Sequence, residues 1–136
     1  MSKIRGQAVP EHALLVTGDV TALYTNMKID RSIAAVGEIF AEYPDPRRPD
    51  EEIIKLLQIA LTRNEFEFAG RLFLQICGTA MGKKFAPSLA NIYLRNLDDK
   101  ARQGHDGTPE NYFRFLDDIF LRGRAPPSNY EILKAF

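Results

Sequence analysis

The amino-acid sequence predicts an α+β fold, because some stretches have the periodicity of strands and others that of helices. Residues 111–122 place two short apolar runs on either side of a pair of acids, a pattern typical of a β-hairpin. An apolar run over residues 13–20 indicates a buried strand with Asp19 near its end. Between residues 29 and 43, apolar residues recur at spacings of three and four, which predicts an amphipathic helix.

The other elements follow from breaker and turn residues. Pro44 ends the first helix, and Asp50 begins a second one as its N-cap. Residues 65–76 alternate around an Ala-Gly turn and predict a second β-hairpin. A third helix is expected over residues 85–101, and a last one over residues 130–136.

Composition limits the classes of protein to which the chain can belong. Its 136 residues, of which 45% are hydrophobic, suffice for one domain, or part of one, with a core. No apolar run approaches the ~20 residues that a membrane-spanning helix needs. The single cysteine, Cys77, cannot form a disulfide within the chain and suits a reducing compartment. A net charge of zero does not indicate nucleic-acid binding, although the first half is acidic and the second basic.

Three acids and one loop stand out as candidates for a site. Asp117 and Asp118, at the tip of the predicted hairpin, could hold a divalent cation, since hard cations take carboxylate oxygens. The alternative is a turn that happens to carry two aspartates. Asp19 ends a buried strand and so needs a partner or a metal, unless it only starts a turn. The small residues of 78–82 let a backbone or a ligand approach closely, but match neither of the standard phosphate-loop patterns.

Three blocks of the sequence, taken together and in this order, resemble motifs A, B and C of the reverse transcriptase palm. The blocks are residues 19–26 (DVTALYTN), 75–91 (QICGTAMGKKFAPSLAN) and 114–120 (RFLDDIF). More narrowly, the chain is similar to the reverse transcriptases of Penelope-like retroelements, of which residues 23–26, 64–68 and 78–82 are typical. The resemblance covers roughly residues 13–123.

This resemblance implies a palm-type antiparallel sheet backed by helices, and template-directed nucleotidyl transfer with two Mg²⁺ ions. Asp19 and Asp117 would be the principal metal ligands and catalytic residues, with Asp118 beside them. The implied partners are an RNA template, a DNA primer and deoxynucleoside triphosphates. The implied location is intracellular and nuclear, with no membrane.

The resemblance also assigns residues to substrate and nucleic acid. Tyr24 matches the aromatic that blocks a ribose 2′-hydroxyl, although on its own it could be a core aromatic. Gln75, Gly78 and Gly82 match the loop that packs near the nascent base pair and the template. Lys83 and Lys84 could meet template phosphate, although exposed lysines commonly do nothing specific. Arg114 could equally be a solubilising charge at a strand edge.

Residues 1–136 are therefore expected to form a partial reverse transcriptase domain: a palm with part of the fingers, without the N-terminal fingers and the thumb. The GIY-YIG endonuclease domain of many Penelope-like proteins is not expected within these residues either, and the isolated chain is not expected to polymerise alone. One alternative is an inactive or domesticated palm that binds nucleic acid or a protein partner. Others are an RNA-templated RNA polymerase, which shares the palm, and an α+β domain without a site.

Overall fold

Strands and helices both occur in the computed structural model, which describes residues 11–103 and 110–124, so the predicted α+β class is confirmed. The chain divides into two units, which are treated separately. The first contains the residues up to Val20 and those from Leu97 onward, and the second contains Thr21–Asn96. The helix predicted over residues 130–136 lies outside the described residues.

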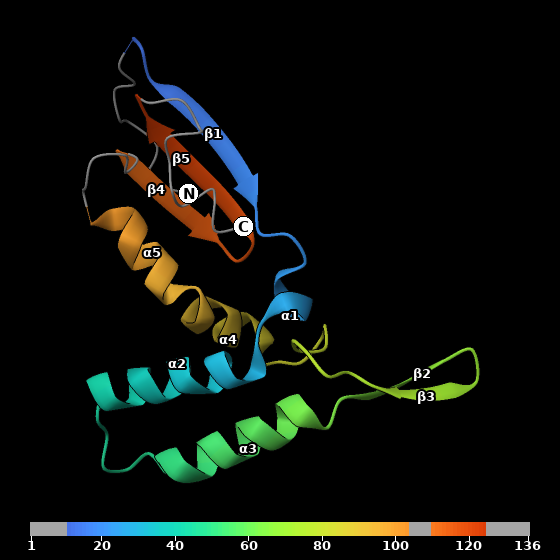
Figure 1. The fold of residues 1–136 in the computed structure, drawn as a ribbon. Coiled ribbons are helices and arrows are strands. Elements are labelled where there is room, and N and C mark those ends of the chain that lie inside the picture. Colours follow the sequence, from blue (N-terminus) through green and yellow to red (C-terminus); the bar gives the residue numbers. More distant parts are fainter. Residues whose placement is uncertain (1–10, 104–109, 125–136) are drawn as a thin grey trace. The chain divides into compact units, whose positions relative to one another are not determined.

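The first unit is built on a three-stranded antiparallel sheet in the order β1–β5–β4 (Figure 1). The strands are β1 (Leu14–Asp19), β4 (Asn111–Phe115) and β5 (Asp118–Gly123). A two-residue turn joins β4 to β5, and β1 pairs with β5 from the opposite side. The predicted strand and the predicted hairpin thus belong to one sheet.

Among the described residues, β1 lies at an edge of this sheet, and the prediction of a buried strand was wrong. Leu14 and Leu15 are 42% and 59% exposed, whereas Ile119 and Leu121 of the central strand β5 are almost completely buried. An apolar run indicates a strand, but it does not say whether neighbours cover both faces and both edges.

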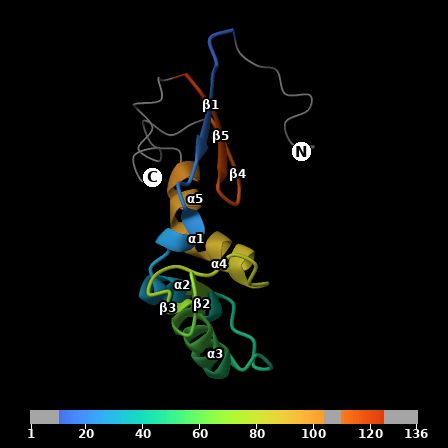
Figure 2. The ribbon, with the colours of Figure 1, turned by 90° about the vertical axis from the view of Figure 1, so that its right-hand side faces the viewer.

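The second unit is mainly helical. Its helices are α1 (Leu23–Asn26), α2 (Ile29–Glu42), α3 (Asp50–Thr62) and α4 (Ala86–Tyr93). α2 packs against both α3 and α4 (Figure 1 and Figure 2). Asp50 is the first residue of α3 rather than its cap, and its carboxylate lies in the first turn, where the helix dipole favours acids. Every helix in the described ranges is too short or too polar to traverse a lipid bilayer.

The third predicted helix is interrupted. α4 ends at Tyr93, and α5 runs from Arg95 to Arg102. Between them, Leu94 has φ −87° and ψ −1°, which takes its backbone out of the regular α-helical geometry. The sequence has no glycine or proline near Leu94 that would indicate a break, and the continuous apolar stripe therefore predicted one helix.

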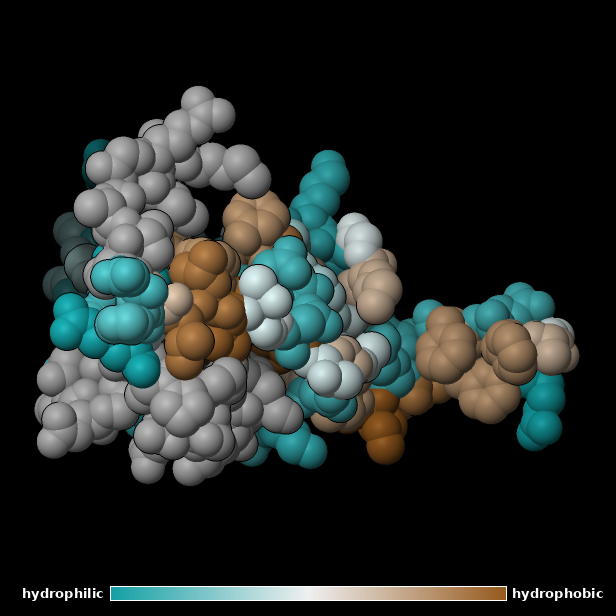
Figure 3. Space-filling model, turned by 90° about the horizontal axis from the view of Figure 1, so that it is seen from above, coloured by the Kyte–Doolittle hydropathy of each residue, from teal (hydrophilic) through white to brown (hydrophobic). Residues whose placement is uncertain are grey.

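The predicted second hairpin is confirmed. Its strands are β2 (Glu65–Phe68) and β3 (Arg71–Leu74). The turn residues Ala69 and Gly70 both have positive φ, of 51° and 72°, as the favoured two-residue hairpin turn requires. Phe66 stacks on Phe73 with 5.6 Å between the ring centroids, yet both rings remain exposed. Figure 3 shows this hairpin carrying apolar side chains on the surface of its unit.

The loop between β3 and α4 lies against the backbone that follows β1. The N–H of Gly78 donates to the carbonyl of Met27 at 2.9 Å, and the N–H of Thr79 donates to that of Tyr24 at 2.7 Å. Gly78 has φ +74°, and a Cβ there would overlap the Tyr24 carbonyl oxygen and lie 2.6 Å from the Cα of Thr25. The loop therefore admits a close backbone approach, as the sequence predicted.

Replacing Gly78 by alanine should lower the free energy of unfolding by about 2 kcal/mol or more, because left-handed backbone strain and a clash add together. Urea unfolding measures the change. Gly82→Ala is the matched control, since Gly82 has φ +90° but open space around it and should lose only the strain, about 1 kcal/mol. A Gly78→Ala protein as stable as the Gly82→Ala protein would contradict the close contact.

Candidate functional site

Three acids meet at one end of the sheet in the first unit. Strands β1 and β5 lie side by side (Figure 1), and their register places Asp19 directly opposite Asp118. One residue beyond Asp19, the N–H of Val20 donates to the carbonyl of Asp117 at 2.9 Å. The fold therefore brings together the backbones of three acids that lie at opposite ends of the sequence.

The negative charges of these three aspartates are not neutralised by ion pairs within the described part of the chain. Asp19 and Asp118 are exposed and Asp117 is half-buried. Among the described residues, no side-chain hydrogen bond or ion pair engages these three carboxylates. Like charges directly opposite each other on antiparallel strands destabilise the pair, by up to about 1 kcal/mol. A bound cation would relieve this repulsion.

The three carboxylates are suitable ligands for magnesium, but their side chains are not positioned to hold an ion together. Carboxylate oxygens are the ligands that Mg²⁺ takes from proteins. In the described part of the chain, however, no three histidine, cysteine, aspartate or glutamate side chains are grouped so that they could hold a metal ion. Exposed side chains change rotamer within nanoseconds, so Asp19 and Asp118 can turn toward an ion without a change in the backbone.

The residues predicted to meet substrate and nucleic acid belong to the second unit. Tyr24 is half-buried on α1, and its backbone contacts Gly78, so the structure brings these two together. The side-chain amide of Gln75 donates to the carbonyl of Cys77 at 2.8 Å. The positions farther along the loop, Gly82, Lys83 and Lys84, are exposed.

A buried ion pair in the first unit was missed by the sequence analysis. Arg114 of β4 donates to both carboxylate oxygens of Asp98 of α5, from Nε at 2.8 Å and from Nη2 at 2.6 Å. The two side chains are only 5% and 12% exposed. The idea that Arg114 is a solubilising charge at a strand edge is therefore wrong.

The surroundings of this pair shift two pKa values. The hydroxyl of Tyr112 donates to Asp98 Oδ1 at 2.6 Å. Burial of the phenol, together with the neighbouring Asp98 carboxylate, raises the pKa of Tyr112. The hydrogen bond to Asp98 also raises the pKa of Arg114. Arg114 therefore stays charged and Tyr112 stays protonated at neutral pH.

The sequence does contain a signal for this cluster. Asp98 lies four residues after Leu94 and three before Ala101, so it falls on the apolar face of its helix. A carboxylate on such a face needs a partner. Tyr112 and Arg114 are two residues apart in a strand and therefore share a face, which makes them candidates for that role.

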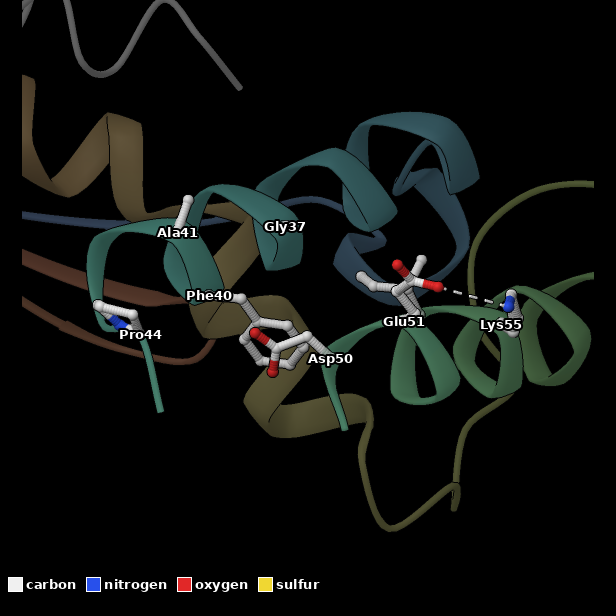
Figure 4. Close-up of a pocket in the computed structure, with 8 residues that line it drawn as sticks. Gly37, Phe40, Ala41, Pro44, Asp50, Glu51 and Lys55 are labelled. Atoms are coloured by element: carbon white, nitrogen blue, oxygen red, sulfur yellow. Dashed lines mark ion pairs between the residues drawn. The ribbon is translucent and has the colours of Figure 1, made fainter. Parts of the chain in front are cut away.

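An open groove of about 620 Å³ lies between α2 and α3 in the second unit (Figure 4). It is lined by Gly37, Phe40, Ala41, Pro44, Asp50, Glu51, Ile54 and Lys55. Glu51 and Lys55 form an exposed ion pair at 3.8 Å. None of the residues predicted to form a site lines the groove, so the acidic end of the sheet remains the candidate site.

No protein-family model matches this chain, and no curated protein matches it in sequence. Among solved structures, it is similar to apo telomerase from Candida tropicalis, truncated from its C-terminal domain. The TM-score is 0.67 at 12% sequence identity, over 90% of this chain and 26% of the telomerase chain. This chain thus spans about a quarter of its neighbour. Because telomerase is related to reverse transcriptases, the likeness confirms the palm-type fold, and it does not single out the Penelope-like group.

Replacing Asp19 by asparagine should stabilise the protein by about 0.2–1 kcal/mol when divalent cations are chelated, because the repulsion from Asp118 is removed. Added Mg²⁺ should stabilise the unchanged protein more than the variant, since a ligand that binds only the folded state raises its stability. Thermal unfolding with EDTA and with Mg²⁺ measures both effects.

The control for that measurement is Asp30→Asn, which removes one exposed acid from the first turn of α2. This variant should keep the full response to Mg²⁺. An equal response from the unchanged protein and from Asp19→Asn would show that Asp19 takes no part in holding the ion.

Proposed function

We propose that this chain supplies the catalytic acids of an RNA-directed DNA polymerase of the Penelope-like group, which extends a DNA primer on an RNA template. The supporting observation is the meeting of the backbones of Asp19, Asp117 and Asp118 at one end of a palm-type sheet, with no basic partner for their side chains among the described residues. The palm fold shared with a telomerase makes this chemistry a natural one for the chain. A fold alone does not fix an activity, so the proposal depends on the acids.

In this mechanism the three aspartates bind the metal ions, and the other predicted site residues select the nucleotide and contact the nucleic acid. Asp19 and Asp117, with Asp118 beside them, would hold two Mg²⁺ ions. When bound, these ions supply the charge that activates the primer 3′-hydroxyl and stabilises the leaving pyrophosphate. The negative charge at the acidic end of the sheet favours their binding.

The selecting residues are those of the second unit. The ring of Tyr24 would exclude a ribose 2′-hydroxyl and so favour deoxynucleoside triphosphates. The loop with Gln75, Gly78 and Gly82 would lie near the nascent base pair, and Lys83 and Lys84 would contact template phosphate. An intracellular, nuclear location is part of the same proposal.

A palm that binds nucleic acid or a protein partner without catalysis is the second candidate. One observation favours it: as the side chains stand, no three potential ligands among the described residues are grouped to hold a metal ion. In this case Asp19 and Asp117 would be replaceable without loss of function.

Replacing Asp117 by asparagine should lower the rate at which the full-length protein extends a primer at least about a hundredfold, because the metal's charge stabilisation is worth several kcal/mol. A gel assay with a DNA primer annealed to an RNA template measures the rate. Asp30→Asn should extend the primer normally. Extension by Asp117→Asn at the normal rate would refute the polymerase proposal. Tight binding of the primer–template by the unchanged protein, without any extension, would favour the non-catalytic palm.

Replacing Tyr24 by alanine should let the same protein incorporate ribonucleotides, because the side chain that blocks the 2′-hydroxyl is gone. The ratio of the kcat/KM values for a ribonucleotide and its deoxynucleotide measures the effect. Tyr24→Phe keeps the ring and should keep the discrimination. A ratio unchanged in Tyr24→Ala would favour an RNA polymerase instead.

A further inference from the structure

The turn that carries Asp117 is held in a conformation that its sequence does not favour. Leu116, the first of the two turn residues, has φ 56°. Turns of two residues in hairpins need this left-handed geometry, and glycine, asparagine or aspartate usually supplies it. For leucine the same geometry costs about 1–2 kcal/mol. A backbone in this state persists only when its surroundings hold it.

Two hydrogen bonds hold this turn, one on each of its carbonyls. Arg114 Nη1 donates to the carbonyl of Leu116 at 2.8 Å. The N–H of Val20 donates to the carbonyl of Asp117 at 2.9 Å. The second bond ties the turn to the residue that follows Asp19, and the first ties it to the interior of the first unit.

Arg114 is itself fixed. Its Nε and Nη2 groups donate to the two carboxylate oxygens of Asp98, and Asp98 Oδ1 also accepts a hydrogen bond from the Tyr112 hydroxyl. Helix α5 therefore connects to the Leu116 carbonyl through one planar guanidinium group. Lysine cannot replace it, since an ammonium group lacks the fork that serves a carboxylate and a carbonyl at once.

We propose that Arg114 is a positioning residue, which sets the places of the Asp117 and Asp118 carboxylates relative to Asp19. This inference rests on the proposed function, because the positions matter only if the acids hold an ion. Without the bond from Arg114, the turn relaxes from its left-handed geometry, and the backbone of Asp117 and Asp118 shifts relative to that of Asp19. Residues that orient metal ligands in this way typically contribute 10–100-fold to metal affinity.

The test compares two variants of the full chain with Mn²⁺ as the probe. Arg114→Lys keeps the charge but loses the fork, and should bind Mn²⁺ about 10–100-fold more weakly in calorimetry or electron paramagnetic resonance titration. Tyr112→Phe is the matched control, because it weakens the same buried cluster but leaves the bond from Arg114 to Leu116 in place. It should lose stability and keep its affinity for Mn²⁺.

Hydrogen exchange supplies a second reading that does not depend on a metal. The amides of Phe115 and Asp118, the pair that closes the turn, should exchange faster in Arg114→Lys than in Tyr112→Phe at equal global stability. Equal Mn²⁺ affinity in Arg114→Lys and the unchanged protein, or an equal loss in both variants, would overturn the proposal. If the unchanged protein binds no Mn²⁺, the proposed function fails. Hydrogen exchange at the amides of Phe115 and Asp118 then decides by itself whether Arg114 holds the turn.

Discussion

The antiparallel pairing of β1 with β5 is the interaction on which the candidate site depends. The two strands come from opposite ends of the sequence, and only their register places Asp19 opposite Asp118. A shift of this register by one residue would send the Asp19 side chain to the other face of the sheet. The bond from the Val20 N–H to the Asp117 carbonyl extends the pairing past the end of β1 and opposes such a shift.

The buried ion pair of Asp98 with Arg114 is the second constraint on this part of the molecule. Removing two charges from water is costly, and the pair persists because hydrogen bonds satisfy both partners. A hydrophobic pair of similar size could fill the space, but it could not reach the Leu116 carbonyl. What the ions add is therefore orientation: they join a helix, a strand and a strained turn in one arrangement.

The residues proposed to take part in the reaction are distributed over both units. The acids belong to the sheet, and the residues expected to select substrate belong to the helical unit, where Gly78 packs directly on the backbone of Tyr24. A telomerase shares this fold at 12% sequence identity, so the fold does not depend on most of the individual residues. The backbone contact at Gly78 depends on the absence of a side chain rather than on a particular one.

Periodicity and turn residues alone predicted the hairpins at 65–76 and 111–122 and most helix boundaries, because these depend on neighbours in sequence. The same information named Asp19, Asp117 and Asp118 as candidates, by residue type and by their places at strand ends. Only the tertiary structure decided that β1 lies at an edge, that the third helix breaks at Leu94, and that Arg114 is buried against Asp98. These features are set by contacts between distant segments, and a local pattern does not record which segment its apolar or charged face will meet.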